Sequence, residues 1–246
     1  FMRPPVEVII VGGSYAGLSA AMALGRSLRT TLIIDSGQPC NRMTPHAHNF
    51  ITQDGNTPDA IRAQALDQVL RYPSIEFEQG EVGQVVGTAG SFVATTLAGQ
   101  QIEAPCILFA TGVKDQLPEV AGVAACWGKT LIHCPYCHGY ETKGQYTGIW
   151  MNHPMAVEYV PMIQHWASEV VLLTGGPVDW DITPLEKLGV PIYQAPVKAL
   201  VHQAGQLNSV VLEDGTTLSM KVLYHPPMTT HHCNIPSQLG CALTEM

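Results

Sequence analysis

Two short apolar runs near the start of the chain predict strands that are buried on both faces. Residues 6–11 (VEVIIV) and 31–35 (TLIID) are rich in β-branched residues, which is typical of strands in parallel sheets. Residues 18–28 between them carry apolar side chains at helical spacing. The order strand, helix, strand predicts a βαβ unit, and therefore an α/β fold.

The pattern continues to about residue 112 and restarts after Pro118. A helix is predicted over 58–71, several strands over 75–109, and a further buried strand over 106–112 that places Cys106 in a core.

A second βαβ unit follows. Residues 146–151 and 169–174 predict strands, and residues 155–167 predict a helix that Pro161 should kink or interrupt. This restart predicts a domain boundary near 115–120, and a chain of 246 residues is long enough for two modest domains.

Composition excludes some classes of partner. Hydrophobic residues make up 46% of the chain and charged residues 13%, which suits a well-buried core. A formal net charge of −8 leaves no basic surface for phosphate backbones, so no nucleic acid is expected. Residues 6–25 are apolar enough to resemble a membrane span, but clustered Gly and Ser together with Glu7 favour a buried strand, turn and helix, and no membrane is expected.

The opening residues and the cysteines bear on location. Residues 1–5 do not begin a basic, apolar, small-residue leader, so none is expected. Seven cysteines is an odd count, which argues against a secreted disulfide framework, and a cytoplasmic location is predicted.

The first βαβ unit carries a glycine loop with candidate binding chemistry. GGSYAG, residues 12–17, follows the first strand and opens the helix, with Ser14 at the middle glycine of a G-x-G-x-x-G pattern. Backbone amides at a helix N-terminus bind pyrophosphate, and Asp35 at the end of the next strand can bond ribose hydroxyls. A tight turn without a ligand is the alternative.

The second candidate site is HCPYCHGYE, residues 133–141, and CPYCHGYE is predicted to begin a helix. In a redox interpretation, one of Cys134 and Cys137 attacks a disulfide and the other resolves the mixed disulfide, while His138 carries the proton. Three alternatives stay open at this point: a C-x-x-C-H haem attachment, a plain structural cysteine pair, and zinc. Zinc would need a further ligand, for which the candidates are His231, His232 and Cys233.

Several segments occur in an order that resembles a known family. They are VGGSYAGLSAAMALGRS, the acid in LIIDSG, HAHNFITQDG, LFATG and a C-x-x-C that starts the second domain. Together they resemble the low-molecular-weight thioredoxin reductases over essentially the whole chain. More narrowly, they resemble the branch with a CHGYE-type centre. That branch resembles both bacterial reductase-like flavoproteins and the fungal dithiol oxidases that close disulfides in epipolythiodioxopiperazines.

The resemblance implies an α/β fold of two Rossmann-like domains of the FAD/NAD(P)-binding type, each a three-layer ββα arrangement. The implied domains are 1–117 for FAD and 118–225 for the C-x-x-C, followed by a crossover over 226–246. The part of the FAD domain that follows this crossover in the family is expected to be absent.

The resemblance also implies FAD and a set of site residues, with no metal. Cys134 matches the interchange thiol, Cys137 the thiol against the flavin ring, and His138 the position where the classical reductases carry an acid/base aspartate. The residues matching FAD-binding positions are Gly12, Gly13, Ser14, Ala16, Gly17, Asp35, Asn49, Val82, Thr111 and Gly112.

The NADPH site of the family is the main departure. Met151, Asn152 and His153 fall on its glycine triplet, and Gly175 and Gly176 fall on the arginines for the 2′-phosphate. Side chains on the triplet should block close approach of a phosphate, so the second domain is expected to keep the fold without ordinary NADPH binding.

The predicted function is a FAD-dependent thiol–disulfide oxidoreductase in which electrons pass between FAD and the Cys134/Cys137 pair. The expected partners are thioredoxin or another disulfide or dithiol, with ferredoxin as a possible donor, and a homodimer is expected. The alternatives are a dithiol oxidase that passes electrons to oxygen and a non-catalytic flavin-binding redox sensor.

Overall fold

The computed structural model describes residues 5–244, which fall into two compact units. The first unit comprises the chain up to Arg42, Pro58–Asp115, and the chain from Thr229 on; the second comprises Met43–Thr57 and Gln116–Met228. The 43–57 loop thus clusters with the second unit, although it lies inside the expected 1–117 domain. Residues 1–4, on which the expectation of no leader partly depends, lie outside the described range.

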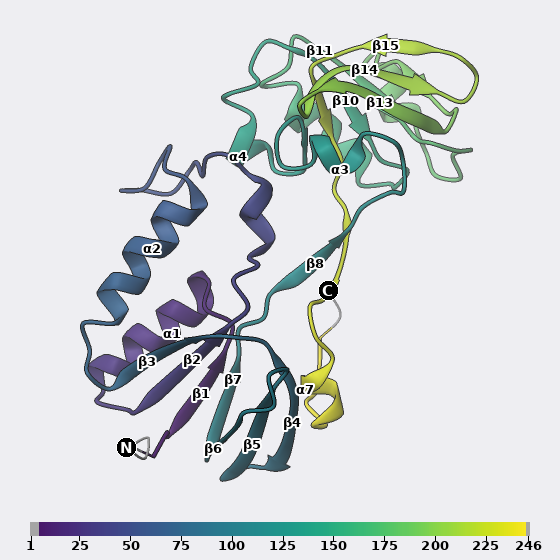
Figure 1. Ribbon diagram of the computed structural model, residues 1–246. Helices are drawn as coiled ribbons and strands as arrows, with labels where there is room; N and C mark the ends of the chain where they lie inside the picture. Colours follow the sequence, from purple (N-terminus) through teal and green to yellow (C-terminus); the bar gives the residue numbers. More distant parts are fainter. Residues whose placement is uncertain (1–4, 245–246) are drawn as a thin grey trace. The chain divides into compact units, whose positions relative to one another are not determined.

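The first unit is built on a parallel sheet in the order β3-β2-β1-β7, in which the predicted strands are confirmed. These strands are β1 (Val8–Val11), β2 (Thr31–Asp35), β3 (Ile75–Gln79) and β7 (Cys106–Phe109). Helix α1 (Tyr15–Arg26) connects β1 to β2, and α2 (Pro58–Val69) precedes β3. Figure 1 shows the two helices side by side on one face of this sheet.

Side chains that point alternately to the two faces of the sheet along β1 and β2 explain the layers of this unit. Ile10 and Ile33 pack with α1 and α2 residues, whereas Ile9 and Leu32 pack against a second sheet on the other face, because successive strand side chains point to opposite faces. That second sheet is antiparallel and consists of β4 (Val82–Thr88), β5 (Ser91–Thr96) and β6 (Gln101–Ala104). The first unit also contains the short helix α7 (Ile235–Gln238) and most of the 3-10 helix η1 (Cys40–Met43).

Cys106 was expected in the core, and this expectation is wrong. The cysteine is exposed at the amino end of β7, and β7 is the edge strand of the four-stranded sheet. An apolar run predicts a strand but does not distinguish a central strand from an edge strand.

The second unit repeats this arrangement around a parallel sheet in the order β12-β11-β10-β16-β9. The strands are β9 (Leu131–Ile132), β10 (Tyr146–Trp150), β11 (Glu169–Leu173), β12 (Ile192–Tyr193) and β16 (Val222–Tyr224). The helices are α3 (Val123–Cys126), α4 (Pro135–His138), α5 (Ala156–Ile163) and α6 (Thr183–Lys187). Pro161 lies inside α5, and the helix ends two residues later, which confirms the expected interruption.

In this sheet too, successive side chains pack against different layers on its two faces. Ile149 and Leu172 pack with residues of α5 and α6, whereas Val171 and Leu173 pack with residues of an antiparallel sheet. That sheet contains β13 (Val197–Gln203), β14 (Gln206–Leu212) and β15 (Thr217–Ser219). Both units are therefore Rossmann-like ββα sandwiches, as expected.

The chain passes between the units through β8 (Val113–Gln116) and β17 (Met228–His231), which pair as a two-stranded sheet. No helix within residues 5–244 is both long and apolar enough to cross a membrane.

Candidate redox and nucleotide sites

The glycine loop of the first unit leaves backbone donors open. Among the described residues, the amide N–H groups of Ser14, Ala16 and Gly17 make no hydrogen bond, and the Ser14 side chain does not cap α1. Unpaired amides at the start of a 12-residue helix form an anion site. The loop therefore suits a pyrophosphate.

The glycines in this loop are required by close backbone contacts. A Cβ on Gly17 would lie 1.9 Å from the carbonyl oxygen of Gly12, and a Cβ on Gly12 would lie 2.3 Å from that of Ala110. Gly12 also has a φ of +106°, in the region that favours glycine. These contacts bring the glycine loop against the turn that holds Thr111 and Gly112.

Asp35 is in contact with the loop but does not present a free carboxylate. Its Oδ1 accepts a hydrogen bond from the Gly13 N–H at 2.9 Å, and its Oδ2 pairs with Arg62 of α2 at 2.5 Å. Sequence reasoning missed Arg62, because a single basic residue in a predicted helix carries no motif.

Two further predicted FAD positions lie outside the glycine loop. Val82, the first residue of β4, is buried in the core of the first unit. Asn49 lies in the 43–57 loop, which clusters with the second unit; its N–H donates to the Asp54 Oδ1 at 2.8 Å. The loop residues predicted for the flavin thus do not form one cluster within one unit.

The Cys134–Cys137 pair is bonded as a disulfide across a single helical turn. The two Cα atoms are 5.3 Å apart, and both residues are partly buried. Cys134 is the N-cap of α4 and Pro135 occupies the first helical position, where a missing N–H costs nothing. The predicted helix after Cys134 is confirmed, but only as this one turn.

Neighbouring residues fix the ends of this turn. A Cβ on Gly139 would lie 2.5 Å from the Pro135 carbonyl oxygen and 2.9 Å from the Trp166 ring, so the glycine allows close packing. Before the disulfide, the Tyr159 hydroxyl donates to the His133 carbonyl at 2.6 Å. The disulfide is therefore held by packing and backbone contacts on both sides.

The imidazole of His138 is biased towards its neutral form. Burial is the main cause of a lowered pKa, and His133 and His48 lower it further, whereas Glu141 opposes them. A neutral imidazole at neutral pH is able to accept a proton from a thiol.

A cavity of about 270 Å³ lies beside this turn within the second unit. His48 lies between two carboxylates there, with its Nε2 3.6 Å from Glu141 and its Nδ1 3.5 Å from Asp54. The residues lining the cavity are His48, Asn49, Asp54, Pro135, Tyr136, Tyr140, Glu141 and Trp166.

The zinc alternative finds no support. Residues 5–244 contain no group of three or more His, Cys, Asp or Glu side chains that could hold a metal ion. His231 and His232 are exposed, and Cys233 lies 3.8 Å from the Thr111 Oγ1.

Two Rossmann-like units, one with an open glycine loop and one with a redox disulfide, define the class of two-domain nucleotide-dependent disulfide oxidoreductases. A family model described as pyridine nucleotide-disulphide oxidoreductase matches residues 6–149. The chain belongs to this family.

Individual relatives agree with this assignment. The thioredoxin reductase sirT of Leptosphaeria maculans is 32% identical over 97% of this chain and 79% of its own length. The solved structure of an oxidoreductase from Agrobacterium tumefaciens has a TM-score of 0.91 at 36% identity, covering 99% of this chain and 82% of that one. A putative thioredoxin reductase TrxB from Bacillus anthracis has a TM-score of 0.92 at 27% identity, covering 97% and 82%.

The cofactor of this protein is FAD, as in its family. The first unit fits this group, because its glycine loop offers unpaired amides to the pyrophosphate. The protein is thus a thioredoxin reductase-like flavoprotein oxidoreductase.

Proposed function

We propose that this protein exchanges electrons between FAD and the Cys134–Cys137 disulfide without ordinary NADPH binding. This proposal rests on the hydrogen bonds within the loop between β10 and α5. Its backbone amides are used internally: Met155 donates to the His153 Nδ1, Ala156 to the His153 carbonyl and Val157 to the Pro154 carbonyl. A dinucleotide phosphate would need these donors.

Side chains also join the two loops that a dinucleotide would contact. Asn152 donates through Nδ2 to the Pro177 carbonyl at 3.0 Å and accepts from the Trp180 Nε1 at 2.8 Å. Met151, on the first position of the family's glycine triplet, is buried in the core. Making room for a dinucleotide between these two loops would therefore break the hydrogen bonds of Asn152 and expose the side chain of Met151.

In the proposed reaction, His138 assists exchange at the disulfide. A substrate thiolate attacks the Cys134 sulfur, the Cys134–Cys137 bond breaks, and a mixed disulfide forms. A second substrate thiol then displaces Cys134, which yields the substrate disulfide and the reduced pair, while His138 accepts a thiol proton. FAD supplies the two-electron acceptor that restores the Cys134–Cys137 disulfide, and the reverse sequence reduces a disulfide partner.

Two observations favour oxidation of a small dithiol as a second candidate function. The lowered pKa of His138 suits proton acceptance from a thiol, and the cavity beside the disulfide carries the exposed aromatic residues Tyr136 and Tyr140. The relatives' names instead favour a thioredoxin-type disulfide partner. A ferredoxin donor, a homodimer, a cytoplasmic location and the 1–117, 118–225 and 226–246 domain boundaries remain predictions.

An anaerobic titration of the flavin absorbance tests this proposal. NADPH at micromolar concentration should leave the flavin oxidised, whereas dithiothreitol should bleach it and admitted oxygen should restore it. Cys137→Ser should abolish the response to dithiothreitol. Prompt bleaching by NADPH would overturn the proposal.

Further measurements on the same protein would identify its electron donor or acceptor. Reduced ferredoxin that bleaches the flavin and then supports thioredoxin reduction would assign the reductive direction. Oxygen uptake that depends on a dithiol would assign the oxidative direction. A flavin that neither donors nor dithiols reduce would assign a non-catalytic redox sensor.

A further inference from the structure

Arg62 closes a small polar ring around the acid of the FAD unit. Its Nη2 pairs with the Asp35 Oδ2 at 2.5 Å, and its Nε donates to the Gly13 carbonyl at 3.1 Å. The Gly13 N–H donates in turn to the Asp35 Oδ1 at 2.9 Å. One guanidinium therefore contacts both the glycine loop and the acid at the end of β2.

The arginine is held firmly yet keeps donors available. The side chains of Arg62 and Asp35 are only 23% and 11% exposed, and the guanidinium carbon lies 5.6 Å from the centre of the Phe77 ring. Among the described residues, the Arg62 Nη1 makes no hydrogen bond. A planar guanidinium fixed along one edge loses little further entropy when its remaining N–H groups bind a ligand.

The positive charge of Arg62 offsets the negative charge of Asp35 next to the glycine loop. The diphosphate of FAD is anionic, and an isolated Asp35 carboxylate beside the glycine loop would repel it. Arg62 neutralises that carboxylate and fixes its rotamer, and Nη1 adds two donors next to the acid.

We propose that Arg62 is a positioning residue for the adenosine diphosphate half of FAD. It orients Asp35, cancels its repulsion of the diphosphate, and presents Nη1 to the nucleotide. This role does not depend on the electron donor or on the direction of the thiol reaction. A purely structural alternative is that Arg62 only attaches α2 to the sheet.

Binding to the apoprotein separates these two roles. The dissociation constant of FAD is measured by quenching of flavin fluorescence, and that of ADP by calorimetry; ADP reports on the adenosine diphosphate half alone. Arg62→Met should weaken both FAD and ADP about 10- to 100-fold, because a charge-assisted contact is lost. Arg62→Lys keeps the charge without the side-on pair of donors and should give a smaller loss for both ligands.

The matched control is Arg71→Met. Arg71 follows the end of α2 and forms an exposed ion pair with Asp67, so its removal should change neither constant. Melting of each apoprotein is recorded in parallel. A folded Arg62→Met protein that binds FAD and ADP within twofold of the wild type overturns the proposal, as does a weaker FAD constant with an unchanged ADP constant. If the methionine variant does not fold, the lysine variant decides: unchanged affinity for both ligands overturns the proposal.

Discussion

The two βαβ units of this protein share a fold but differ where a helix follows the first strand. At the start of α1, the amides of Ser14, Ala16 and Gly17 are unpaired among the described residues. At the start of α5, the amides of Met155 and Ala156 both donate to His153, one to its side chain and one to its carbonyl. The first loop is therefore ready for an anion, and the second has used its donors itself.

On our proposal that the second unit does not bind NADPH in the ordinary way, this difference explains how a nucleotide fold keeps its architecture and loses its binding site. Every helix begins with backbone donors that need partners. A glycine loop leaves them for a ligand, whereas a side chain such as that of His153 satisfies them from within. The second unit then contributes the disulfide, and the first contributes the cofactor site.

The largest expected effect comes from comparing two histidines of the second unit. His138→Gln should lower kcat for dithiol oxidation about 100-fold, because the proton acceptor is lost, whereas His153→Gln should change it less than twofold. Since burial lowers the pKa of His138, the wild-type rate should fall as the pH drops through a value below the ordinary 6.5. Stopped-flow flavin reduction across pH measures both effects.

The rate of His138→Gln, measured over the same pH range, should no longer fall at low pH. A fall that persists in the glutamine variant would assign the titration to another group, and an equal loss in His153→Gln would contradict the separation of the two loops. Far-ultraviolet circular dichroism of both variants checks that the fold is retained.

The next effect concerns the backbone contact in the first loop. Gly17→Ala places a Cβ 1.9 Å from the Gly12 carbonyl oxygen, so the loop must shift, and FAD affinity should fall about 10- to 50-fold. The matched change in the second unit is Gly176→Ala, whose Cβ would meet nothing nearer than the Asn152 Nδ2 at 3.9 Å. Flavin retained after gel filtration measures both. Equal loss in the two variants would contradict the comparison.

Much of this architecture could be predicted from the sequence because it depends on local patterns. The apolar runs of β1 and β2, the glycine loop between them and the helix beginning after Cys134 each have a signal within a few residues. The sequence also places Met151, Asn152 and His153 where the resemblance implies the family's second glycine triplet, and this assignment stays a prediction.

The remaining features depend on contacts between distant segments, which periodicity does not report. Arg62 reaches Asp35 across 27 positions, and Trp180 reaches Asn152 across 28. The association of the 43–57 loop with the second unit follows from contacts such as His48 with Glu141, which the loop's own sequence does not indicate. Burial was also misjudged at Cys106, because edge and central strands share one pattern.

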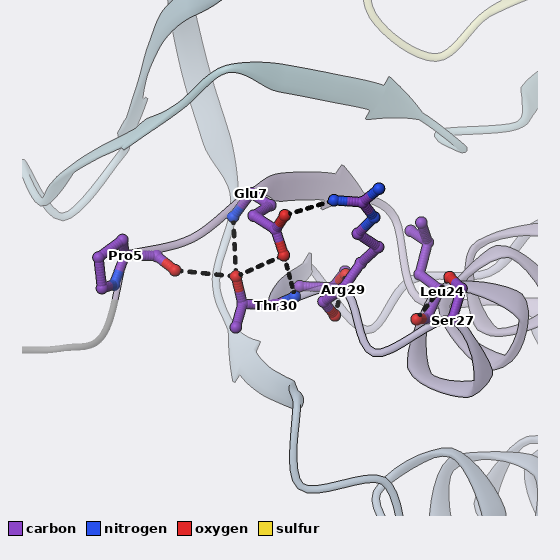
Figure 2. A network of polar contacts seen from close by, with 7 residues as sticks. Pro5, Glu7, Leu24, Ser27, Arg29 and Thr30 are labelled. Atoms are coloured by element: carbon purple, nitrogen blue, oxygen red, sulfur yellow. Dashed lines mark hydrogen bonds and ion pairs between the residues drawn. The ribbon is translucent and has the colours of Figure 1, made fainter.

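The smallest predicted effect lies at the end of β1 opposite the glycine loop. Figure 2 shows Glu7 there, with its Oε1 2.8 Å from the Arg29 Nη1 and its Oε2 accepting from the Thr30 N–H at 2.8 Å. The Thr30 hydroxyl donates to the Pro5 carbonyl at 2.9 Å, which ties the chain entering β1 to the start of β2. This network supports the strand without contacting the nucleotide loop.

Glu7→Gln should therefore lower the melting temperature by only about 1–3 °C at neutral pH, because the ion pair is exposed, and should leave FAD affinity unchanged. The hydrogen bond from the Thr30 amide, followed by that from Arg29, lowers the pKa of Glu7 from its ordinary 4.5. A carboxyl group whose folded pKa is lowered stabilises the protein above the unfolded pKa and loses that contribution as the pH falls through the folded one. The gap between variant and wild type should consequently close below pH 4.5, as followed by thermal melts at several pH values. A constant gap would show that the carboxylate charge is not the cause, and a change in FAD affinity would show that the two ends of β1 are coupled.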